Sequence, residues 1–181
     1  MSTVRQLLQT ASSPDHHLGP PLLGFVIVGA ALWICARGLM ARLCGLGAAA
    51  AFVLAAEVTL GRPGSSLEAG HLSLLRSCRI TDPWSWSTEG LLNVALLAPF
   101  CFLAVLAVGH PMLVSLTGIA MSVGFETVQA ATNRGVCDSS DVVHNALGAI
   151  AAAVLAGVLR RWWRWGRSAV LAPSQVWSSS C

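Results

Sequence analysis

Five apolar stretches, separated by polar connections, run along the chain. They cover about residues 21–36, 44–60, 91–108, 112–130 and 142–159. Each has roughly 16–19 residues, which at about 1.5 Å per residue gives a helix slightly shorter than the thickness of the hydrocarbon layer. The pattern therefore predicts an all-α, polytopic bundle of about five transmembrane helices.

The composition supports a membrane location and excludes several kinds of chemistry. Apolar residues make up 55% of the 181 residues and charged residues only 10%, whereas about a quarter of a soluble domain is charged. All 11 basic residues are Arg, and without Lys the chain has no Walker-type phosphate loop, no Schiff-base nucleophile and no Ser–Lys dyad. The formal net charge of +3 is too small to indicate nucleic-acid binding.

The apolar pattern divides the chain into three parts. Residues 1–20 form a polar or interfacial N-terminal segment, residues 21–165 the membrane domain, and residues 166–181 a flexible, Ser-rich tail. Because Arg5 is the only basic residue before the first apolar stretch, we expect that stretch to be a retained helix and not a cleaved signal peptide.

The arginines predict an orientation in the membrane. Arg37 and Arg42 lie between the first two stretches, and four further arginines interleaved with tryptophans (Arg160, Arg161, Arg164 and Arg167 with Trp162, Trp163 and Trp165) follow the fifth. Such clusters anchor the cytoplasmic ends of helices. With five spans, both clusters fall on the same side, so we expect the N-terminus outside and the C-terminus in the cytoplasm. The other side would carry five arginines, against six on the cytoplasmic side.

The polar residues of the apolar stretches gather at one membrane face. Five alternating spans place them all near the same helix ends, whichever way the bundle is oriented: Glu57, Glu89, Asn93, Glu126, Asp141, His144 and Asn145. A single polar residue near a helix end is commonly a cap or a snorkelling side chain. Ser139 or Ser140 is a candidate cap for the last helix, and Asp141 would suit its first turn. Capping does not account for the whole set.

The spacing of these residues places them on shared helical faces. Glu126 and Gln129 are three residues apart, and Asp141, His144, Asn145 and Gly148 follow offsets of three, four and seven. On the last helix the same face continues into Ala152, so we expect it to pack against other helices.

These residues resemble the motifs of the VanZ-like membrane proteins. The resemblance rests on Glu126-x2-Gln129-x4-Arg134-x3-Asp138-x2-Asp141-x3-Asn145-x2-Gly148 and on Asn93 followed by an apolar run and Pro99. It covers roughly residues 80–160, and the chain departs from the family where Phe100-Cys101-Phe102 replaces a Gly after the proline. The resemblance implies a location in a bacterial plasma membrane and a link to resistance against teicoplanin, the association of the family's namesake. It also implies action on lipid head groups or lipid-linked cell-wall intermediates.

The residue types permit a phosphoester reaction on such a lipid. Arg134 would hold a phosphate with two parallel hydrogen bonds, and Glu126 or Asp141 would act as general base. Gln129, Asp138, Asn145, Asn93 and His144 would bind or orient the substrate. No cofactor is expected. A metal held by Glu126, Asp138 and Asp141 ranks below a metal-free site. The expected partners are membrane lipids or a lipid-linked precursor.

Two other hypotheses remain open at this point. The polar cluster can bind or shield a cell-wall precursor without turnover, or it can only lock the helices together through buried hydrogen bonds. A transporter is less favoured because the spans show no repeated halves.

Cysteines and tryptophans in the polar connections add two further expectations. The six cysteines show no CxxC spacing. Cys78 and Cys137 lie in the two connections on the polar face, where an extracytoplasmic disulfide is conceivable. Trp84 and Trp86 mark the membrane interface, with a gate over the cluster as the alternative.

Overall fold

The computed structural model describes residues 19–61, 78–84, 86–132 and 137–170, and this part of the chain is almost entirely helical. Its helices, in chain order, are α2 (Gly19–Cys35), α3 (Leu39–Leu60), α4 (Thr88–Leu96), α5 (Ala98–Val108), α6 (Pro111–Thr132) and α7 (Ser139–Val170). The prediction of an all-α bundle is confirmed. Residues 1–18 and 171–181 lie outside the described residues, so the domain boundaries at 20 and 165 stay predictions.

Four helical segments are long and apolar enough to cross a membrane. They are Leu39–Leu60, Thr88–Val108, Pro111–Thr132 and Ser139–Trp165, and α2 adds a shorter apolar helix. Large apolar side chains cover the outside of the bundle, among them Leu23 and Ile34 on α2 and Leu113 on α6. An exposed apolar surface of this kind is unfavourable in water and favourable in lipid, so the chain is a membrane protein.

The third predicted span is broken into two helices. Leu97 interrupts the helical backbone between α4 and α5, and Pro99 lies in the first turn of α5. Proline has no N–H to donate, and its ring clashes with the carbonyl four residues earlier. The sequence predicted one continuous helix over residues 91–108, and the proline explains the interruption.

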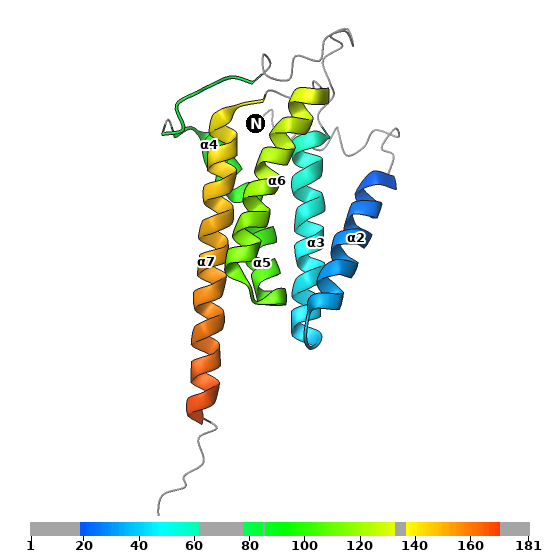
Figure 1. Ribbon diagram of the computed structural model, residues 1–181, viewed down its shortest axis with the longest axis vertical. Coiled ribbons are helices and arrows are strands. Elements are labelled where there is room, and N and C mark those ends of the chain that lie inside the picture. Colours follow the sequence, from blue (N-terminus) through cyan, green and yellow to red (C-terminus); the bar gives the residue numbers. More distant parts are fainter. Residues whose placement is uncertain (1–18, 62–77, 85, 133–136, 171–181) are drawn as a thin grey trace, which may run out of the picture.

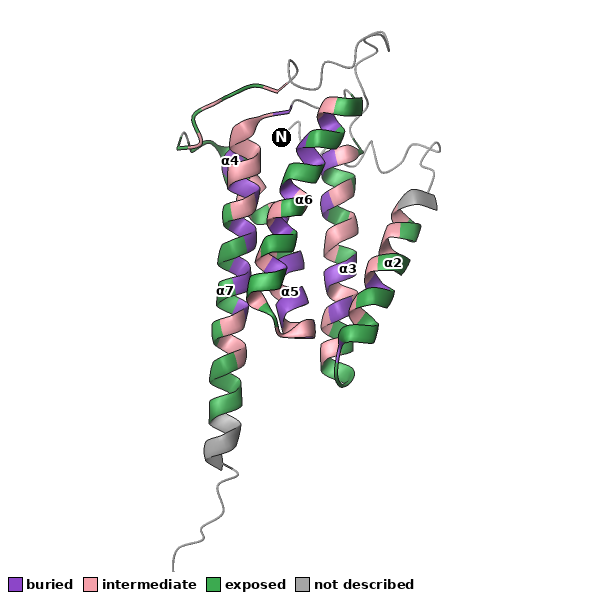
Figure 2. Ribbon diagram, in the orientation of Figure 1, coloured by how far each residue is buried: buried purple, intermediate pink, exposed green. Residues whose placement is uncertain are grey.

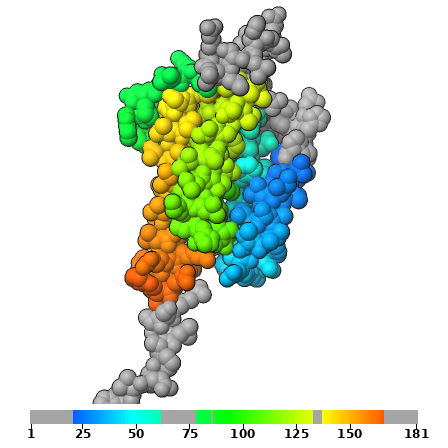
Figure 3. Space-filling model, in the orientation of Figure 1, coloured from blue at the N-terminus to red at the C-terminus, as the bar shows by residue number. Residues whose placement is uncertain are grey.

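Helix α7 runs along one side of the bundle and contacts α4, α5 and α6 (Figure 1). On the other side, α3 packs between α5 and α2. Figure 3 shows α6 and α7 side by side, with the last turns of α7 extending beyond the start of α6. The end of α3, the start of α4, the end of α6 and the start of α7 lie together at one end of the molecule, here called the polar end (Figure 1). The α2–α3 turn, the α5–α6 turn and the last turns of α7 lie at the opposite end, the arginine end.

Buried positions lie along each of the inner helices (Figure 2), and small side chains let these helices pack closely in the interior. Six alanines that are at most 2% exposed line the core, together with Phe100 and Phe125: Ala48, Ala55, Ala104, Ala149, Ala153 and Ala156. An added side-chain carbon at Gly118 of α6 would come within 2.5 Å of Cβ of Ala149 on α7. Membrane helices commonly associate through such small residues because lipid offers no hydrophobic driving force.

The helices extend further than their apolar stretches. Helix α3 begins at Leu39, so Arg42, expected in the connection, lies in its first turn. Helix α7 continues past residue 159 to Val170, and its Arg160 donates to the carbonyl oxygens of Val105 and Leu106 at the end of α5, at 3.0 and 2.9 Å. Gly109 directly follows the last residue of α5 and terminates the helix. Its φ of 81° is the left-handed conformation that glycine adopts easily.

Candidate functional site

The two connections at the polar end are joined to each other. Cys78 and Cys137 form a disulfide, which the sequence had left open. Beside it, the N–H of Arg79 donates to the carbonyl of Cys137 at 2.9 Å, and the N–H of Ser139 donates to the carbonyl of Arg79 at 3.0 Å. The connection before α4 and the start of α7 therefore form one structural unit over the polar end of the bundle.

Asp138 directly precedes the first residue of α7 and has a structural role. Its carboxylate accepts hydrogen bonds from the N–H and the hydroxyl of Ser140, each at 2.9 Å, and from the hydroxyl of Thr81. Asp138 is thus the cap of α7, where the sequence favoured Ser139 or Ser140. Burial alone would raise the pKa of Asp138, but the hydrogen bonds from Thr81 and Ser140 and the charge of Arg79 together lower it below its usual value.

Glu126 joins α6 to the start of α7. Its side chain is only 5% exposed, and its Oε2 accepts a hydrogen bond from the N–H of Asp138 at 2.9 Å. One turn deeper, the hydroxyl of Ser122 donates to the carbonyl of Val142 at 2.9 Å. These two hydrogen bonds fix the register of α6 against α7. Glu126 was predicted as a general base, and this hydrogen bond gives it a structural role as well.

Gln129 reaches from α6 to α3. Its Nε2 donates to the carbonyl oxygen of Thr59 at 3.2 Å, and both residues are buried. The Oε1 of Gln129 and the hydroxyl of Thr59 have no hydrogen-bond partner among the described residues. The contact positions Gln129 but uses only part of its hydrogen-bonding capacity.

His144 is held under the connection that precedes α4. Its ring is 1% exposed, lies 5.0 Å from the ring of Trp86, and contacts the carbonyl oxygen of Pro83 through Nε2 at 3.0 Å. Because a carbonyl oxygen only accepts, Nε2 carries the hydrogen in this contact, and Nδ1 of the neutral ring has a lone pair. Nδ1 has no partner among the described residues. A His fixed through one nitrogen and unpaired at the other has the arrangement of an oriented base.

The absence of a side chain at Gly90 makes room for this ring. A carbon added at Gly90 of α4 would come within 2.8 Å of Cε1 and 3.0 Å of Nδ1 of His144. Gly148, one turn further along α7, plays the same part for the backbone, because an added carbon there would overlap the carbonyl oxygen of Val94. These two glycines let α4 and α7 cross closely.

Asp141 and Asn145 complete the polar face of α7. Asp141 is half-buried; the side chain of Asn93 forms a hydrogen bond with its carboxyl group, and His144, Asp138 and Glu89 are near enough to act on its charge. Asn145 is 2% exposed, and its Oδ1 has no partner among the described residues. The predicted polar face thus contains both satisfied and unsatisfied groups.

The predicted site residues do not all lie in one place. Asn93, Asp138, Asp141 and His144 are near one another through the interactions given above, and Glu126 joins them through Asp138. Gln129 lies about a turn nearer the membrane surface than Glu126, at the contact with α3. Arg134 lies outside the described residues.

The sequence did not identify Thr59, Thr81 and Ser122 as part of the polar cluster. All three bear hydroxyls, which are common throughout helices and connections, so residue type alone could not single them out. Ser122 lies four residues before Glu126 on the predicted face, and this spacing was the available signal.

The described residues offer no preformed metal centre. Within residues 19–61, 78–84, 86–132 and 137–170, no group of three or more His, Cys, Asp or Glu side chains is placed to hold a metal ion. Asp138 already uses its carboxylate to cap α7, which disfavours the metal set of Glu126, Asp138 and Asp141.

A comparison with protein families gives one match. The family model described as VanZ/LLP1 matches residues 50–160, which is more than half of the chain. The match includes the second half of α3, where the sequence offered no recognisable motif, as well as all the residues of the polar end described above. No curated protein and no solved structure gives a significant match to the chain.

Proposed function

The chain belongs to the VanZ-like family, and from this premise we propose that its polar end binds and processes the head group of a lipid or lipid-linked cell-wall intermediate. A contribution to glycopeptide resistance, including resistance to teicoplanin, is part of this proposal. The site would take substrate from the leaflet at the polar end.

The observation that carries the proposal is a set of buried polar atoms that have no hydrogen-bond partner within the described parts of the chain. They come from three helices: the hydroxyl of Thr59, Oε1 of Gln129, Nδ1 of His144 and Oδ1 of Asn145. A buried polar group without a hydrogen bond costs about 1–3 kcal/mol, and such groups are rare in folded proteins. Each of these atoms can accept a hydrogen bond, so a ligand rich in hydroxyl or amide donors, such as a sugar or peptide head group, would satisfy them.

The hydrogen bonds of three carboxylates at the polar end support a choice of general base. Glu126 and Asp138 each have a structural hydrogen bond, whereas Asp141 is half-buried and is held by Asn93 beside His144. We therefore assign Asp141 as general base, with His144 as the group that accepts or returns a proton. In a phosphoester hydrolysis, Asp141 would take a proton from the attacking water while the water oxygen bonds to phosphorus and the bond from phosphorus to the leaving oxygen breaks. That proton would then pass through Nδ1 of His144 to the leaving oxygen, which departs as a hydroxyl group.

Arg134 stays the predicted phosphate ligand, on the sequence argument alone. It lies between Thr132 and Cys137 in the chain, and both of those residues belong to the polar end. A guanidinium group suits a phosphate because its planar fork can donate two parallel hydrogen bonds.

The orientation of the chain is also a proposal. Disulfides persist in oxidising compartments, so the Cys78–Cys137 pair favours an extracytoplasmic polar end. Arginines favour the cytoplasmic side, and α7 ends with them. Two independent features thus support the C-terminus in the cytoplasm and, with α2 as a span, the N-terminus outside.

Two conservative substitutions separate catalysis from helix locking. Wild type, Asp141→Asn and Glu126→Gln would be placed in nanodiscs of total bacterial lipid containing lipid-linked precursors. Head-group release would be followed by mass spectrometry, and unfolding by melting temperature. We expect Asp141→Asn to lose most of the turnover, at least about 100-fold as is typical for removing a general base, at an unchanged melting temperature. Glu126→Gln should lower the melting temperature, because it weakens the bond to Asp138.

Other results would overturn this assignment. If both variants melt early and wild type releases nothing, the cluster only locks helices. If wild type retains a precursor that Asp141→Asn does not retain, and neither releases a product, the protein shields its ligand without turnover. The near-complete burial of His144 and Asn145 is the observation that favours this second candidate function.

A further inference from the structure

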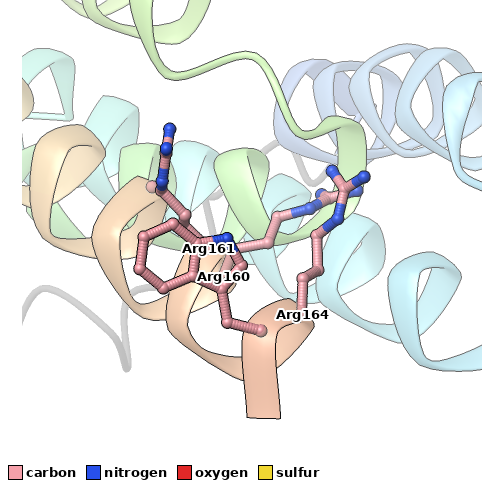
Figure 4. Close-up of a pocket in the computed structure, with 5 residues that line it drawn as sticks. Arg160, Arg161 and Arg164 are labelled. Carbon is pink, nitrogen blue, oxygen red and sulfur yellow. The ribbon is translucent and has the colours of Figure 1, made fainter. Parts of the chain in front are cut away.

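The two ends of the molecule offer opposite hydrogen-bonding chemistry. At the arginine end, a cavity of about 470 Å³ is lined, besides Gly157, by side chains that can only donate hydrogen bonds: Arg160, Arg161, Arg164 and Trp165 (Figure 4). At the polar end, the four buried atoms that have no hydrogen-bond partner in the described part of the chain can all accept one. A ligand of the polar end is therefore recognised through its own N–H or O–H groups.

These four acceptor atoms belong to two separate helix contacts. His144 and Asn145 lie on α7, and the ring of His144 packs against Gly90 of α4. Gln129 of α6 reaches α3 instead, where its Nε2 donates to the carbonyl oxygen of Thr59 at 3.2 Å. The contact between α3 and α6 therefore lies beside the proposed reaction centre and not within it.

The hydrogen bond between Gln129 and Thr59 has a structural role that involves only part of each residue. Thr59 lies in the last turn of α3, where carbonyl groups have no partner within the helix, and Nε2 of Gln129 supplies one. Because a carbonyl oxygen only accepts, the nitrogen of the amide faces it, which fixes the orientation of the amide group. The Oε1 of Gln129 and the hydroxyl of Thr59 take no part in this bond and have no partner in the described part of the chain.

Burial makes these two atoms unfavourable for the fold on their own. The side chains of Thr59 and Gln129 are only 7% and 6% exposed. A buried polar group without a hydrogen bond lowers stability, whereas an apolar side chain of the same shape does not. One turn before Gln129, the ring of Phe125 stacks with Phe52 of α3 at 6.4 Å between ring centres, so the interior side of the contact is apolar. A ligand at the polar end can supply the hydrogen bonds that the interior does not.

We propose that Thr59 and Gln129 form a recognition subsite for a hydroxyl or amide group of the head group, and that they select head groups with such a group over a bare phosphate. The role of this subsite rests on the function proposed above for the polar end. A hydroxyl or secondary amide donates its hydrogen to Oε1 of Gln129, and its oxygen accepts from the hydroxyl of Thr59. A head group that reaches both this subsite and Asp141 spans two helix contacts, so it is larger than a phosphate.

Binding of matched lipid probes tests the subsite. The full chain in nanodiscs would be titrated with three polyprenyl pyrophosphates: one without a further head group, one with an N-acetylated disaccharide, and one with the same disaccharide carrying a peptide. We expect wild type to bind at least one of the larger probes about tenfold more tightly than the bare pyrophosphate, as two hydrogen bonds would provide. A preference that begins with the disaccharide identifies a sugar group, and one that begins with the peptide identifies a peptide amide.

Thr59→Val removes the hydroxyl and keeps the shape of the side chain and the carbonyl that Gln129 binds. We expect it to lose about fivefold of the preference, to bind the bare pyrophosphate as wild type does, and to melt no earlier, because the lost group has no partner in the fold. Thr59→Ser keeps a hydroxyl and should keep the preference. The matched control is Thr127→Val on α6, because the exposed hydroxyl of Thr127 already donates to the carbonyl of Val123 at 2.7 Å. This control should bind all three probes as wild type does.

The possible failures are distinguishable. Equal affinities of wild type for the three probes would overturn the subsite and leave the proposed function standing, whereas no binding of any probe would overturn both. A Thr59→Val variant that melts earlier and keeps the preference would show that the hydroxyl serves the fold alone. If Thr59→Val does not fold, Thr59→Ala is compared with Thr59→Ser, since these two variants differ only in the hydroxyl. Equal preferences in that pair would overturn the subsite.

Discussion

Individual polar residues of the bundle differ in how completely their hydrogen bonds are satisfied. Asp138 accepts three hydrogen bonds and caps α7. His144 and Asn145, six and seven residues later, are almost fully buried, and each has an atom with no hydrogen-bond partner in the described part of the chain. The sequence pattern predicts all three residues equally as members of the polar site. The difference arises from what the connection before α4 places against each of them, which the sequence does not reveal.

The satisfied carboxylate predicts a pH effect. Because the pKa of Asp138 is lowered in the folded protein, the group stabilises the fold above the usual carboxyl pKa of about 3.9, and this stability is lost as the pH falls through the lower folded value. Asp138→Asn should therefore be less stable than wild type at neutral pH, by about 1 kcal/mol, because hydrogen bonds to a charged group are roughly twice as strong as neutral ones. It should also lose less stability than wild type as the pH falls below about 3.9.

The matched control for this measurement is Asp82→Asn. The carboxylate of Asp82 is exposed and accepts one hydrogen bond, from the N–H of Trp84. Melting curves of this variant should follow the pH dependence of wild type. An Asp138→Asn variant with the same acid sensitivity as wild type would show that its carboxylate is not the group that titrates.

Among the elements, the crossing of α4 and α7 depends on a glycine. Gly148→Ala would push an added carbon into the carbonyl oxygen of Val94, so the two helices must separate. We expect a loss of about 1–3 kcal/mol, as for overpacked cores. Gly124→Ala on α6 is the control, since, apart from the adjoining backbone of α6, no atom of the described residues lies within 4 Å of its added carbon. Equal melting temperatures for the two variants would contradict the close crossing.

The helices themselves were largely predictable from the sequence, and the contacts between them were not. Apolar runs in the sequence predicted the four segments that are long enough to cross a membrane and the shorter helix α2, because a bilayer requires such runs. The break at Leu97 was missed because Pro99 lies inside an otherwise apolar run, although its missing N–H is the cause. The alternating direction of successive spans was sufficient to predict that the polar cluster lies at one end of the bundle. The structural roles of Glu126 and Asp138 could not be predicted, because they depend on how the connection from Cys78 to Pro83 pairs with residues 137–139. No periodic pattern in the sequence encodes that pairing.

At the scale of the whole molecule, charge and disulfide chemistry together predict the orientation. We expect the arginine end in the cytoplasm, so a fluorescent protein fused to the C-terminus should fluoresce and alkaline phosphatase fused there should be inactive. The opposite pair of results would place the disulfide in a reducing compartment and would contradict the orientation.

The central claim is that a polar site at one end of a membrane bundle acts on a lipid-linked head group. It is tested most directly by mass spectrometry of lipids and lipid-linked precursors from a deletion strain that carries an empty vector, wild type or Asp141→Asn. We predict that wild type changes the abundance of at least one head-group species, and that Asp141→Asn, expressed at the same level, leaves the profile of the empty vector. Identical profiles in all three strains would contradict the claim.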